Sequence, residues 1–569
     1  MKAKRRDEKE GDESESKVSL EKLSFLKKSA LAAILVIFAL ALTSGVASAG
    51  VIKVPEDYTT IQGAINAVDA ANRTIEVNAS AYNAQGIPET VVVNKSDIII
   101  KSVNGRAVVS AGGTDDHVFN ITDQRNVTLQ GFEIRDAHGT SQTVAGIYMN
   151  NASECNISDN FVTNISATDW RSFGIWMKDS DNNTFSSSTS VSFINAGNDA
   201  VGIELDSSTN NTFSSSTSVS FINATWAFGI ALGGSTNNTF SSSTSVSFIN
   251  AANQNAYGIL LEDSANNKFS SSTSVSFINA ANGDAFGIYL VISTNNKFSS
   301  GTTVSNLTAN DDAYGIYLSW SDDNEFYDCT ISDLTAGGAP TTYGVYMDES
   351  DNNTISQAKI FKGAGPPIDC GVYMQGCSDD FILDSDIFDC YYGIYIDDKS
   401  THTISGNKIY GNDFVGIYLT RTWDNIITEN EIRDNGEGIL IEESSFNNTI
   451  ERNMIKRNGV DTGVYLTTGS YENEIHENCF IDNVPQAYDD VIGGNNDWDR
   501  NYWSPPPGEP GDPYLIPGDA GSRDNDPLPY CPGRKPPAKV PALTPTGIIA
   551  LIGLLSVVLA VSIRIGRKR

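Results

Sequence analysis

The chain is organised by an internal repeat, and a repeat of this period restricts it to a solenoid or another stacked array. The segment SSSTSVSFINA occurs four times, beginning at Ser186, Ser214, Ser241 and Ser270. A shorter motif, Gly-[Ile/Val]-x-[Leu/Met/Ile], recurs in one register with its glycine at residues 146, 174, 202, 229, 258, 287, 315, 344, 371, 393, 416, 438 and 463. One structural unit is therefore repeated along most of the 569 residues.

Each repeat holds three short segments in which apolar and polar residues alternate. In the repeat that starts at Gly315 these are residues 315–318, 324–327 and 329–331, separated by Asn, Asp, Ser and Gly. Alternation at period two predicts strands, and the separators predict turns. Three strands per repeat without helices predict an all-β protein, a parallel β-helix with three strands per coil and an apolar interior.

Pairs of asparagines precede the second strand of several repeats. They are Asn182-Asn183, Asn237-Asn238, Asn266-Asn267, Asn295-Asn296 and Asn352-Asn353. At equivalent turns of stacked coils these amides come into register, so they predict a stacked amide ladder. We interpret this ladder as structural and not as a binding site.

Both ends of such a solenoid need caps, because an open end exposes apolar core and unpaired strand edges. Residues 51–80 predict an N-terminal cap, with a helix over residues 58–68 whose apolar residues have helical spacing. The aromatic segment 498–503 predicts the opposite cap. The Pro- and Gly-rich residues 505–546 predict an extended stalk.

The N-terminus has the features of a secretory signal. A polar start with Lys and Arg precedes an apolar run at residues 30–42, and Ala47-Ser48-Ala49 forms a small-x-small cleavage pattern before Gly50. Residues 1–49 are therefore expected to be a signal peptide. The alternative is an uncleaved membrane anchor, which the long polar leader favours.

A second apolar segment near the C-terminus, residues 547–563, is just long enough to cross a bilayer. The basic residues 564–569 behind it would stay in the cytoplasm. With the preceding PALTPTG, the helix and tail resemble the sorting signals of surface proteins processed by exosortase or archaeosortase enzymes, which implies removal of the helix and a different anchor. Either way we expect a secreted protein held at the cell surface and membrane.

The composition fits an exterior protein and excludes nucleic acid as a partner. The chain has 70 Asp+Glu against 38 Lys+Arg, a net charge of −32, and a surface of this sign repels phosphate backbones. Sequons such as those at Asn72, Asn126 and Asn164 fit a glycoprotein. Of the 7 cysteines, Cys370 and Cys390 fall in adjacent repeats and form a candidate disulfide.

Two segments resemble a known family. Residues 51–65, VIKVPEDYTTIQGAI, resemble the opening of right-handed parallel β-helix proteins with the pectin lyase-like fold. Residues 495–504, NNDWDRNYWS, are similar to the last coil of NosD-type (periplasmic copper-binding protein, CASH-domain) repeat proteins of archaeal cell surfaces, although Pro505-Pro506-Pro507 replaces the Asp-Tyr that usually follows. The resemblance implies a right-handed β-helix but little about function, since this scaffold serves lyases, hydrolases, tail spikes and adhesins.

These features together predict the organisation of the chain. The expected parts are a signal peptide (1–49), an N-terminal cap with the first coils (50–115), β-helix repeats (116–504), a stalk (505–546), a transmembrane or sorting helix (547–563) and a cytoplasmic tail (564–569).

The sequence predicts no metal site. Four methionines occupy equivalent motif positions with the parity of inward Leu and Ile, so they are expected in the core: Met149, Met177, Met347 and Met374. The four histidines, at residues 117, 138, 402 and 476, are scattered. Copper sites need clusters of Cys, Met or His, which this pattern does not supply.

The better binding candidate is aromatic. In strands of the GIYL type Ile and Leu point inward, so the residue between them points outward. Six consecutive repeats carry tyrosine there: Tyr289, Tyr317, Tyr346, Tyr373, Tyr395 and Tyr418. Because sugars pack their apolar faces on aromatic rings, we predict that this face binds an extracellular polysaccharide or surface glycan. The alternative is that tyrosine only suits an exposed strand and stacks on its neighbours.

One cluster fits an enzyme loosely. Asp397, Asp398, Arg421 and Glu442-Glu443 follow the same strand in three successive repeats. A Ca²⁺-dependent polysaccharide lyase needs carboxylates that hold Ca²⁺ and an Arg or Lys base on one face. The other interpretation is an exposed charge ladder in which Arg421 bridges acids. The near-identical repeats over residues 182–298 suit a spacer, so any active site is expected between residues 289 and 443.

The sequence therefore predicts a secreted, surface-anchored and non-catalytic β-helix protein, an envelope component or adhesin that binds glycans and needs no cofactor. A Ca²⁺-dependent lyase or a glycoside hydrolase is the first alternative, and a purely structural glycosylated coat protein is the second.

Overall fold

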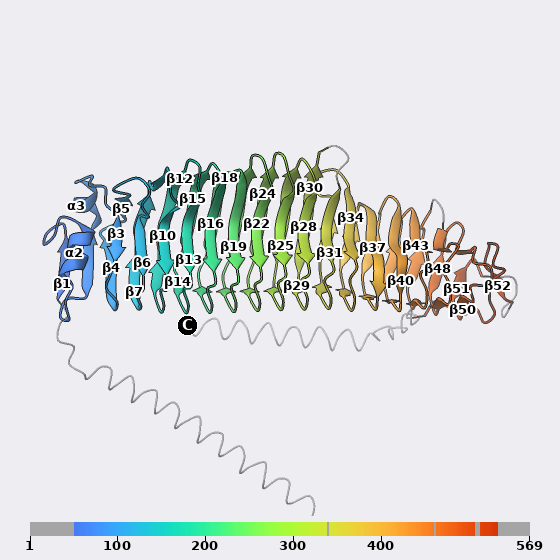
Figure 1. The fold of residues 1–569 in the computed structure, drawn as a ribbon. Helices are drawn as coiled ribbons and strands as arrows, with labels where there is room; N and C mark the ends of the chain where they lie inside the picture. The colour runs from blue at the N-terminus through green and yellow to red at the C-terminus, as the bar shows by residue number, and fades with distance from the viewer. Residues whose placement is uncertain (1–49, 338–340, 460–461, 507–511, 533–569) are drawn as a thin grey trace, which may run out of the picture.

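The computed structural model describes residues 50–337, 341–459, 462–506 and 512–532. Over this part the chain winds into one long solenoid whose coils follow one another in sequence order (Figure 1). The expected signal peptide, C-terminal helix and basic tail lie outside the described residues. Among the residues that are described, no helix is long and apolar enough to cross a membrane.

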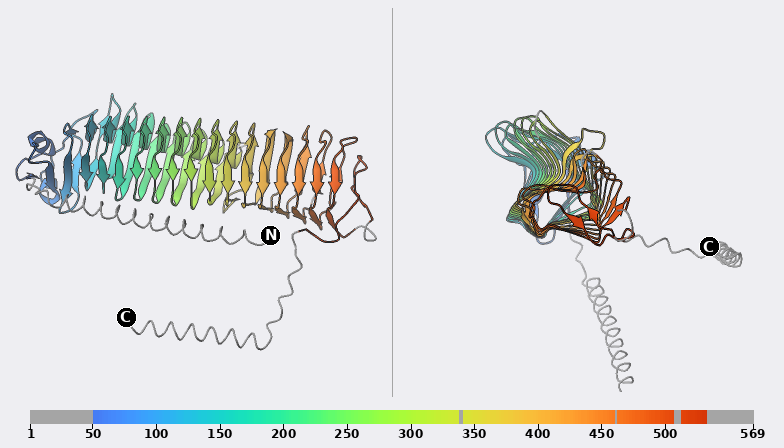
Figure 2. Two further views of the ribbon diagram at one scale, coloured as in Figure 1. Left: turned by 90° about the horizontal axis from the view of Figure 1, so that it is seen from below. Right: turned by 90° about the vertical axis from the view of Figure 1, so that its right-hand side faces the viewer.

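Most coils contribute one strand to each of three parallel sheets, which we call sheets A, B and C. Seen from its end, the solenoid shows its coils stacked along one axis, with the teal and green coils extending further to one side than the orange ones (Figure 2). The predicted fold is confirmed: the protein is all-β, a right-handed parallel β-helix with three strands per coil and a helix in its N-terminal cap.

Sheet A contains the short second strand of each coil, 18 strands in the described chain. Its stacked phenylalanines, one in each of six coils, are fully buried inside the solenoid with ring centroids 4.4–4.9 Å apart. The strands are β1 (Val51–Val54), β2 (Thr74–Asn78), β4 (Ile98–Val103), β7 (Val127–Gln130), β11 (Asn156–Ser158), β14 (Thr184–Ser186), β17 (Thr212–Phe213), β20 (Thr239–Phe240), β23 (Lys268–Phe269), β26 (Lys297–Phe298), β29 (Glu325–Tyr327), β32 (Thr354–Ser356), β35 (Phe381–Leu383), β38 (Thr403–Ser405), β41 (Ile426–Thr428), β44 (Thr449–Glu451), β47 (Glu474–His476) and β50 (Asp497–Asp499).

Sheet B contains the Gly-Ile-x-Leu motif and has 16 strands in the described chain. They are β3 (Val91–Val93), β6 (Phe119–Thr122), β10 (Val144–Asn150), β13 (Ser172–Lys178), β16 (Asp199–Asp206), β19 (Trp226–Gly233), β22 (Ala256–Glu262), β25 (Ala285–Val291), β28 (Ala313–Ser319), β31 (Thr342–Asp348), β34 (Ile368–Gln375), β37 (Cys390–Ser400), β40 (Val415–Trp423), β43 (Glu437–Glu442), β46 (Thr462–Leu466) and β49 (Tyr488–Asp489).

Sheet C carries the TSVSFINA part of the repeated segment. Its strands are β5 (Ala107–Ser110), β8 (Phe132–Arg135), β9 (His138–Gly139), β12 (Phe161–Ala167), β15 (Thr189–Ala196), β18 (Thr217–Ala224), β21 (Thr244–Ala251), β24 (Thr273–Ala280), β27 (Thr302–Ala309), β30 (Cys329–Ala336), β33 (Lys359–Phe361), β36 (Asp386–Phe388), β39 (Lys408–Tyr410), β42 (Glu431–Arg433), β45 (Met454–Lys456), β48 (Cys479–Ile481) and β51 (Tyr502–Ser504).

The strands of sheet C bend at the phenylalanine of the repeated segment. Phe193, Phe221, Phe248 and Phe277 have φ of 56–57° and stack on one another outside the solenoid at 4.8 Å. The neighbouring coils place Asn164 and Asn306 at this bend, with φ of 55° and 57°. A bulky residue in the left-handed region costs about 1–2 kcal/mol, which asparagine largely avoids. The four coils therefore accept strain and carry an exposed aromatic ridge.

The predicted amide ladder is confirmed. The second asparagine of each pair is buried, and the first adopts the left-handed turn conformation, with φ of 57–59°. Asn296 Oδ1 accepts the main-chain N–H of Asn267 at 2.9 Å and its side-chain amide at 3.1 Å. The amide of Asn296 in turn donates to the carbonyl of Ser264 at 2.8 Å and to Asn324 Oδ1 at 3.2 Å. The ladder thus satisfies main-chain groups of a buried turn.

A helical cap covers the N-terminal end. Helix α2 (Ile61–Ala67) is shorter than the predicted 58–68, because Thr60 caps it by accepting the N–H of Gly63 at 3.1 Å. The buried carboxylate of Glu89 accepts the N–H of Ile61 at 3.0 Å and of Gln62 at 3.1 Å. A second short helix, α3 (Ala79–Asn83), follows β2. These contacts satisfy the unpaired donors of the first helical turn.

The far end of the solenoid differs from the expected extended stalk. Residues 512–532 pack back on the last coil, with a short hairpin of β52 (Tyr514–Leu515) and β53 (Arg523–Asp524). The ring of Tyr514 lies 3.9 Å from that of Trp503 and parallel to it. A stalk would leave the apolar end of the solenoid in water, so burial favours the folded-back arrangement.

Asp524 provides the polar part of this C-terminal cap. Its carboxylate accepts the N–H of Arg500 at 3.1 Å, the N–H of Asn501 at 2.8 Å and the indole N–H of Trp503 at 3.0 Å. A disulfide between Cys479 and Cys531 ties the cap to β48. The other five cysteines are buried free thiols, so Cys370 and Cys390 are not joined.

Removal of one buried asparagine should show how much the amide ladder contributes to stability. Asn296→Ala leaves several buried polar groups of neighbouring coils without partners, and we expect the free energy of unfolding to fall by about 2–4 kcal/mol. Asn295→Gly is the matched control, because glycine keeps the left-handed turn and Asn296 stays in place. Urea denaturation measures both, and equal losses in the two variants would contradict the structural role of the ladder.

Loss of the Asp524 carboxylate should open the C-terminal cap. We expect Asp524→Ala to speed amide hydrogen exchange at Arg500 and Asn501 by about 10- to 100-fold, which corresponds to about 1–3 kcal/mol of lost hydrogen bonding. Exchange at the N-terminal cap, for example at Ile61, should stay unchanged. Unaltered exchange at Arg500 and Asn501 would mean that residues 512–532 do not cover the last coil.

Candidate functional site: the outer face of sheet B

The motif glycine bends the strands of sheet B from β10 to β46 and so determines which of their side chains reach the outer face. A Cβ atom on Gly315 would lie 2.5 Å from the carbonyl oxygen of Gly344 and 2.5 Å from Ile331 Cγ2, so only glycine fits there. The paired residues on either side of it are Tyr314 with Tyr343, and Ile316 with Val345. The bend turns the residue before the glycine and the second residue after it to the same outer face.

The second residue after the glycine forms the central column of this face. Its six tyrosines lie in register in successive coils, and neighbouring ring centroids are 4.5–5.0 Å apart. They are Tyr289, Tyr317, Tyr346, Tyr373, Tyr395 and Tyr418, all half-buried. The structure thus places the predicted residues side by side, and their binding role stays a prediction.

The residue before the glycine forms a second, proximal column that our sequence reasoning missed. Phe228, Tyr257, Phe286, Tyr314 and Tyr343 stack with centroids 4.9–5.2 Å apart and planes within 5°. The signal was present, because five successive repeats carry an aromatic residue directly before the motif glycine. Strict alternation along the strand would place this residue inside the solenoid. The bend at the glycine turns it to the outer face instead.

Ring orientation divides the central column into two parts. Tyr289 and Tyr317 are stacked at 18°, so each covers a face of the other. Tyr346 is turned by 63° from Tyr317 and by 80° from Tyr343. Tyr395 is likewise turned by 88° from Tyr373. A ring stacked between two parallel neighbours offers only its edge, whereas tilted and edge-on rings do not cover each other in full. From Tyr346 onward the successive rings are tilted or edge-on, so face-to-face stacking in the central column ends there.

A polar rim runs beside the tyrosines at the strand ends. The hydroxyl of Tyr346 donates to Gln375 Oε1 at 2.9 Å, and that of Tyr373 donates to Asp397 Oδ2 at 3.3 Å. Burial raises the pKa of Tyr373, and the charge of Asp397 raises it further. The phenol therefore stays protonated and remains a donor. The same causes raise the pKa of Tyr395 to about 12.

Acidic residues on this rim are never adjacent along the axis. From β16 to β43 the rim position reads Asp206, Gly233, Glu262, Val291, Ser319, Asp348, Gln375, Asp397, Thr420 and Glu442. Like charges directly opposite one another on neighbouring strands are destabilising, and this spacing avoids them. The rim therefore stays acidic without internal repulsion between neighbouring coils.

The structure brings two of the three candidate catalytic residues together. Arg421 forms ion pairs with Asp397 and, at 2.9 Å, with Glu443. Partial burial acts to lower the pKa of Arg421, but the charges of Asp397 and Glu443 outweigh it and the pKa is raised. Asp398 lies in the same strand, β37, with a positive φ of 65°, and its Oδ1 accepts the N–H of Lys399 at 3.0 Å. A lyase base needs a lowered pKa, so this geometry favours the charge ladder.

Comparison with protein families decides the class of the chain. Residues 329–508 match the model described as periplasmic copper-binding protein (NosD), and residues 218–368 match the right handed beta helix region. The chain is a NosD-type β-helix repeat protein. The second match covers all five residues of the proximal column, and the first covers the turned tyrosines.

Solved structures show only distant likeness, and no curated protein matches the chain. The periplasmic alginate epimerase AlgG is 12% identical over 73% of this chain and 80% of its own, with a TM-score of 0.29. Tailspike protein 3 of bacteriophage CBA120 is 11% identical over 79% and 65%, with a TM-score of 0.31. A GH87 α-1,3-glucanase catalytic domain is 13% identical over 79% and 69%, with a TM-score of 0.23. Identities and TM-scores this low give no information about the function of this chain.

The copper in the family description does not fit the residues of this NosD-type chain. The four motif methionines are fully buried in the core, as their parity predicts. Within the described ranges, no group of three or more His, Cys, Asp or Glu is placed to hold a metal ion. Copper requires such a cluster of soft or imidazole ligands, which these residues do not form.

A double substitution distinguishes the charge ladder from a lyase site. Because the side chain of Asp397 is only 9% exposed, Arg421→Gln leaves a nearly buried carboxylate without its cation. We expect a loss of about 1–3 kcal/mol in unfolding free energy, most of it restored by adding Asp397→Asn. Urea denaturation measures this. Unchanged stability together with lost release of unsaturated sugar from acidic polysaccharides would instead support the lyase.

Proposed function

We propose that this NosD-type protein is a secreted, surface-anchored and non-catalytic β-helix that binds carbohydrate on the outer face of sheet B. The observation that carries the proposal is the turned part of the central column, Tyr346, Tyr373, Tyr395 and Tyr418, where successive rings are tilted or edge-on to one another instead of stacked face to face. These rings span four coils, about 14 Å along the axis at the usual strand spacing. That length suits several units of an extended glycan chain.

The chemistry around these rings supports a sugar ligand. Each aromatic platform lies beside hydroxyl, amide and carboxylate groups, among them Gln375 and Asp397. Apolar sugar faces pack on the rings, and sugar hydroxyls meet the rim. The net charge of −32 favours a neutral glycan over an acidic one.

The proposed location rests on the chain termini. The signal-like residues 1–49, the apolar residues 547–563 and the basic tail support export and anchoring at the cell surface. A membrane partner through the C-terminal segment belongs to the same proposal. The Ca²⁺-dependent lyase or glycoside hydrolase and the structural coat protein are the competing outcomes of the experiment below.

Two pairs of substitutions test the binding face. We expect Tyr346→Ala with Tyr373→Ala to weaken binding to a neutral polysaccharide about tenfold or more, since each aromatic contact contributes about 0.5–1.5 kcal/mol. Tyr289→Ala with Tyr317→Ala is the matched control, because those rings cover each other, and we expect a smaller change. Affinity electrophoresis against a panel of neutral and acidic polysaccharides measures both.

The same samples separate the alternatives. Equal losses in both pairs would contradict the role of ring orientation, and no retention by any polysaccharide would favour the structural coat protein. Size-exclusion chromatography of the polymer, with and without Ca²⁺, reveals an enzyme through shortened chains.

A further inference from the structure

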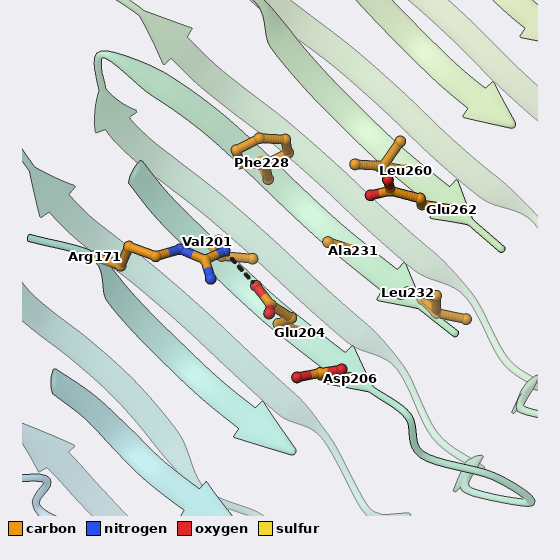
Figure 3. A pocket seen from close by; sticks show the side chains of 10 residues that line it. Arg171, Val201, Glu204, Asp206, Phe228, Ala231, Leu232, Leu260 and Glu262 are labelled. Atoms are coloured by element: carbon orange, nitrogen blue, oxygen red, sulfur yellow. Dashed lines mark hydrogen bonds and ion pairs between the residues drawn. The ribbon is translucent and has the colours of Figure 1, made fainter. Parts of the chain in front are cut away.

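The central column is interrupted in the middle of the solenoid, and the interruption forms a pocket. Between Trp176 and Tyr289 the column position holds Glu204, Ala231 and Leu260 instead of aromatic residues. The resulting pocket has a volume of about 290 Å³ and is lined by β16, β19 and β22 (Figure 3). It lies among the near-identical repeats that we had interpreted as a spacer.

The floor of this pocket is apolar. Ala231 lies near its centre, between Glu204 and Leu260 of the neighbouring strands, and Phe228 lies beside it on the same strand (Figure 3). Phe228 stacks on Tyr257 at 4.9 Å and 1°, but on its other side the paired residue is Val201, which has no ring. Phe228 is therefore the last ring of its stack, and on the side of β16 it meets the aliphatic Val201 instead of another ring. A volume near the lower end of small-molecule pockets suits one sugar ring.

The rim of the pocket is charged and held in place. Arg171 pairs with Glu204 at 2.9 Å and with Asp199 at 3.2 Å, and its guanidinium lies over the ring of Phe173 at 4.7 Å. The positive charge of Arg171 is thus already shared by two acids. Asp206 and Glu262 add further carboxylates to the lining, so the pocket keeps a net negative charge.

Glu204 is the most buried of these carboxylates, with a side chain only 12% exposed. Burial raises its pKa to about 7, against the opposing charge of Arg171 and with a further increase from Asp206. A second cation beside Glu204 would stabilise its ionised form, which one shared arginine does only in part. A ligand that complements this pocket would therefore carry a positive charge next to an apolar surface.

We propose that this pocket binds a sugar unit that carries a protonated amine. The apolar face of the ring lies over Ala231 and Phe228, and the ammonium group faces Glu204, with Asp206 and Glu262 close by. Acidic sugars are repelled by the same carboxylates. The proposal rests on the proposed function only in taking a carbohydrate as ligand, since its site and sugar chemistry differ from those of the tyrosines.

Isothermal titration calorimetry of the whole protein tests this. The probes are a β-1,4-linked glucosamine tetrasaccharide, its N-acetylated form and a glucose tetrasaccharide of the same linkage. We expect the free amine to bind at least tenfold more tightly than the other two. Ala231→Tyr should abolish this preference by filling the pocket, and it should fold, because eight other coils carry tyrosine at this position. Equal affinity for the three probes, or unchanged amine binding in Ala231→Tyr, would overturn the proposal.

A charge-matched pair controls for general attraction to an acidic protein. Asp206→Asn with Glu262→Gln should weaken amine binding at least tenfold, whereas Glu474→Gln with Asp497→Asn, exposed on sheet A, should change it less than twofold. Equal effects of the two pairs would mean non-specific attraction and would overturn the pocket.

The two sites can fail independently. Ala231→Tyr should leave retention by neutral polysaccharides unchanged, and the Tyr346 and Tyr373 variants should leave amine binding unchanged. Lost polysaccharide retention in Ala231→Tyr would contradict two separate sites and overturn the pocket as a site of its own.

Discussion

Parallel hydrogen bonding between successive coils is the constraint on which the rest of this structure depends. Because each coil pairs in register with the next, every position of the repeat lies about 4.8 Å from its own copies. Where a residue recurs in successive coils, its side chain must therefore pack beside an identical side chain. Asparagine meets this condition because its amide both donates and accepts, as Asn267, Asn296 and Asn324 show. Phenylalanine and tyrosine meet it because their rings stack.

Charged side chains cannot stack on identical neighbours, because like charges repel. The chain avoids this repulsion in two ways. On the rim of sheet B an uncharged residue separates successive acids. Where acids do gather, an arginine joins them: Arg171 bridges Asp199 and Glu204, and Arg421 bridges Asp397 and Glu443. A chain with a net charge of −32 can thus stack its coils closely, and the two arginines hold acids at sites where a ligand could reach them.

Much of the fold and part of the site followed from residue patterns. The repeat and its period-two alternation predicted the strands, and Asn-Asn pairs predicted the ladder, because local chemistry and register alone decide these features. The tyrosine column could be placed for the same reason. The proximal column, the turned rings from Tyr346 onward and the pocket around Ala231 could not. They depend on the bend at the motif glycine and on how neighbouring coils pack, which one repeat viewed alone does not show.

The sequence by itself determined the architecture, since a period that recurs in one register leaves a parallel solenoid as the way to bury its apolar face. It also determined which side chains form columns. The tertiary structure decided what those columns can do. Glycine bends turned Phe228 and Tyr314 outward, and packing placed Arg171 between two acids. Residues 512–532 folded back on Trp503 instead of extending, because an exposed apolar end is less stable than a covered one.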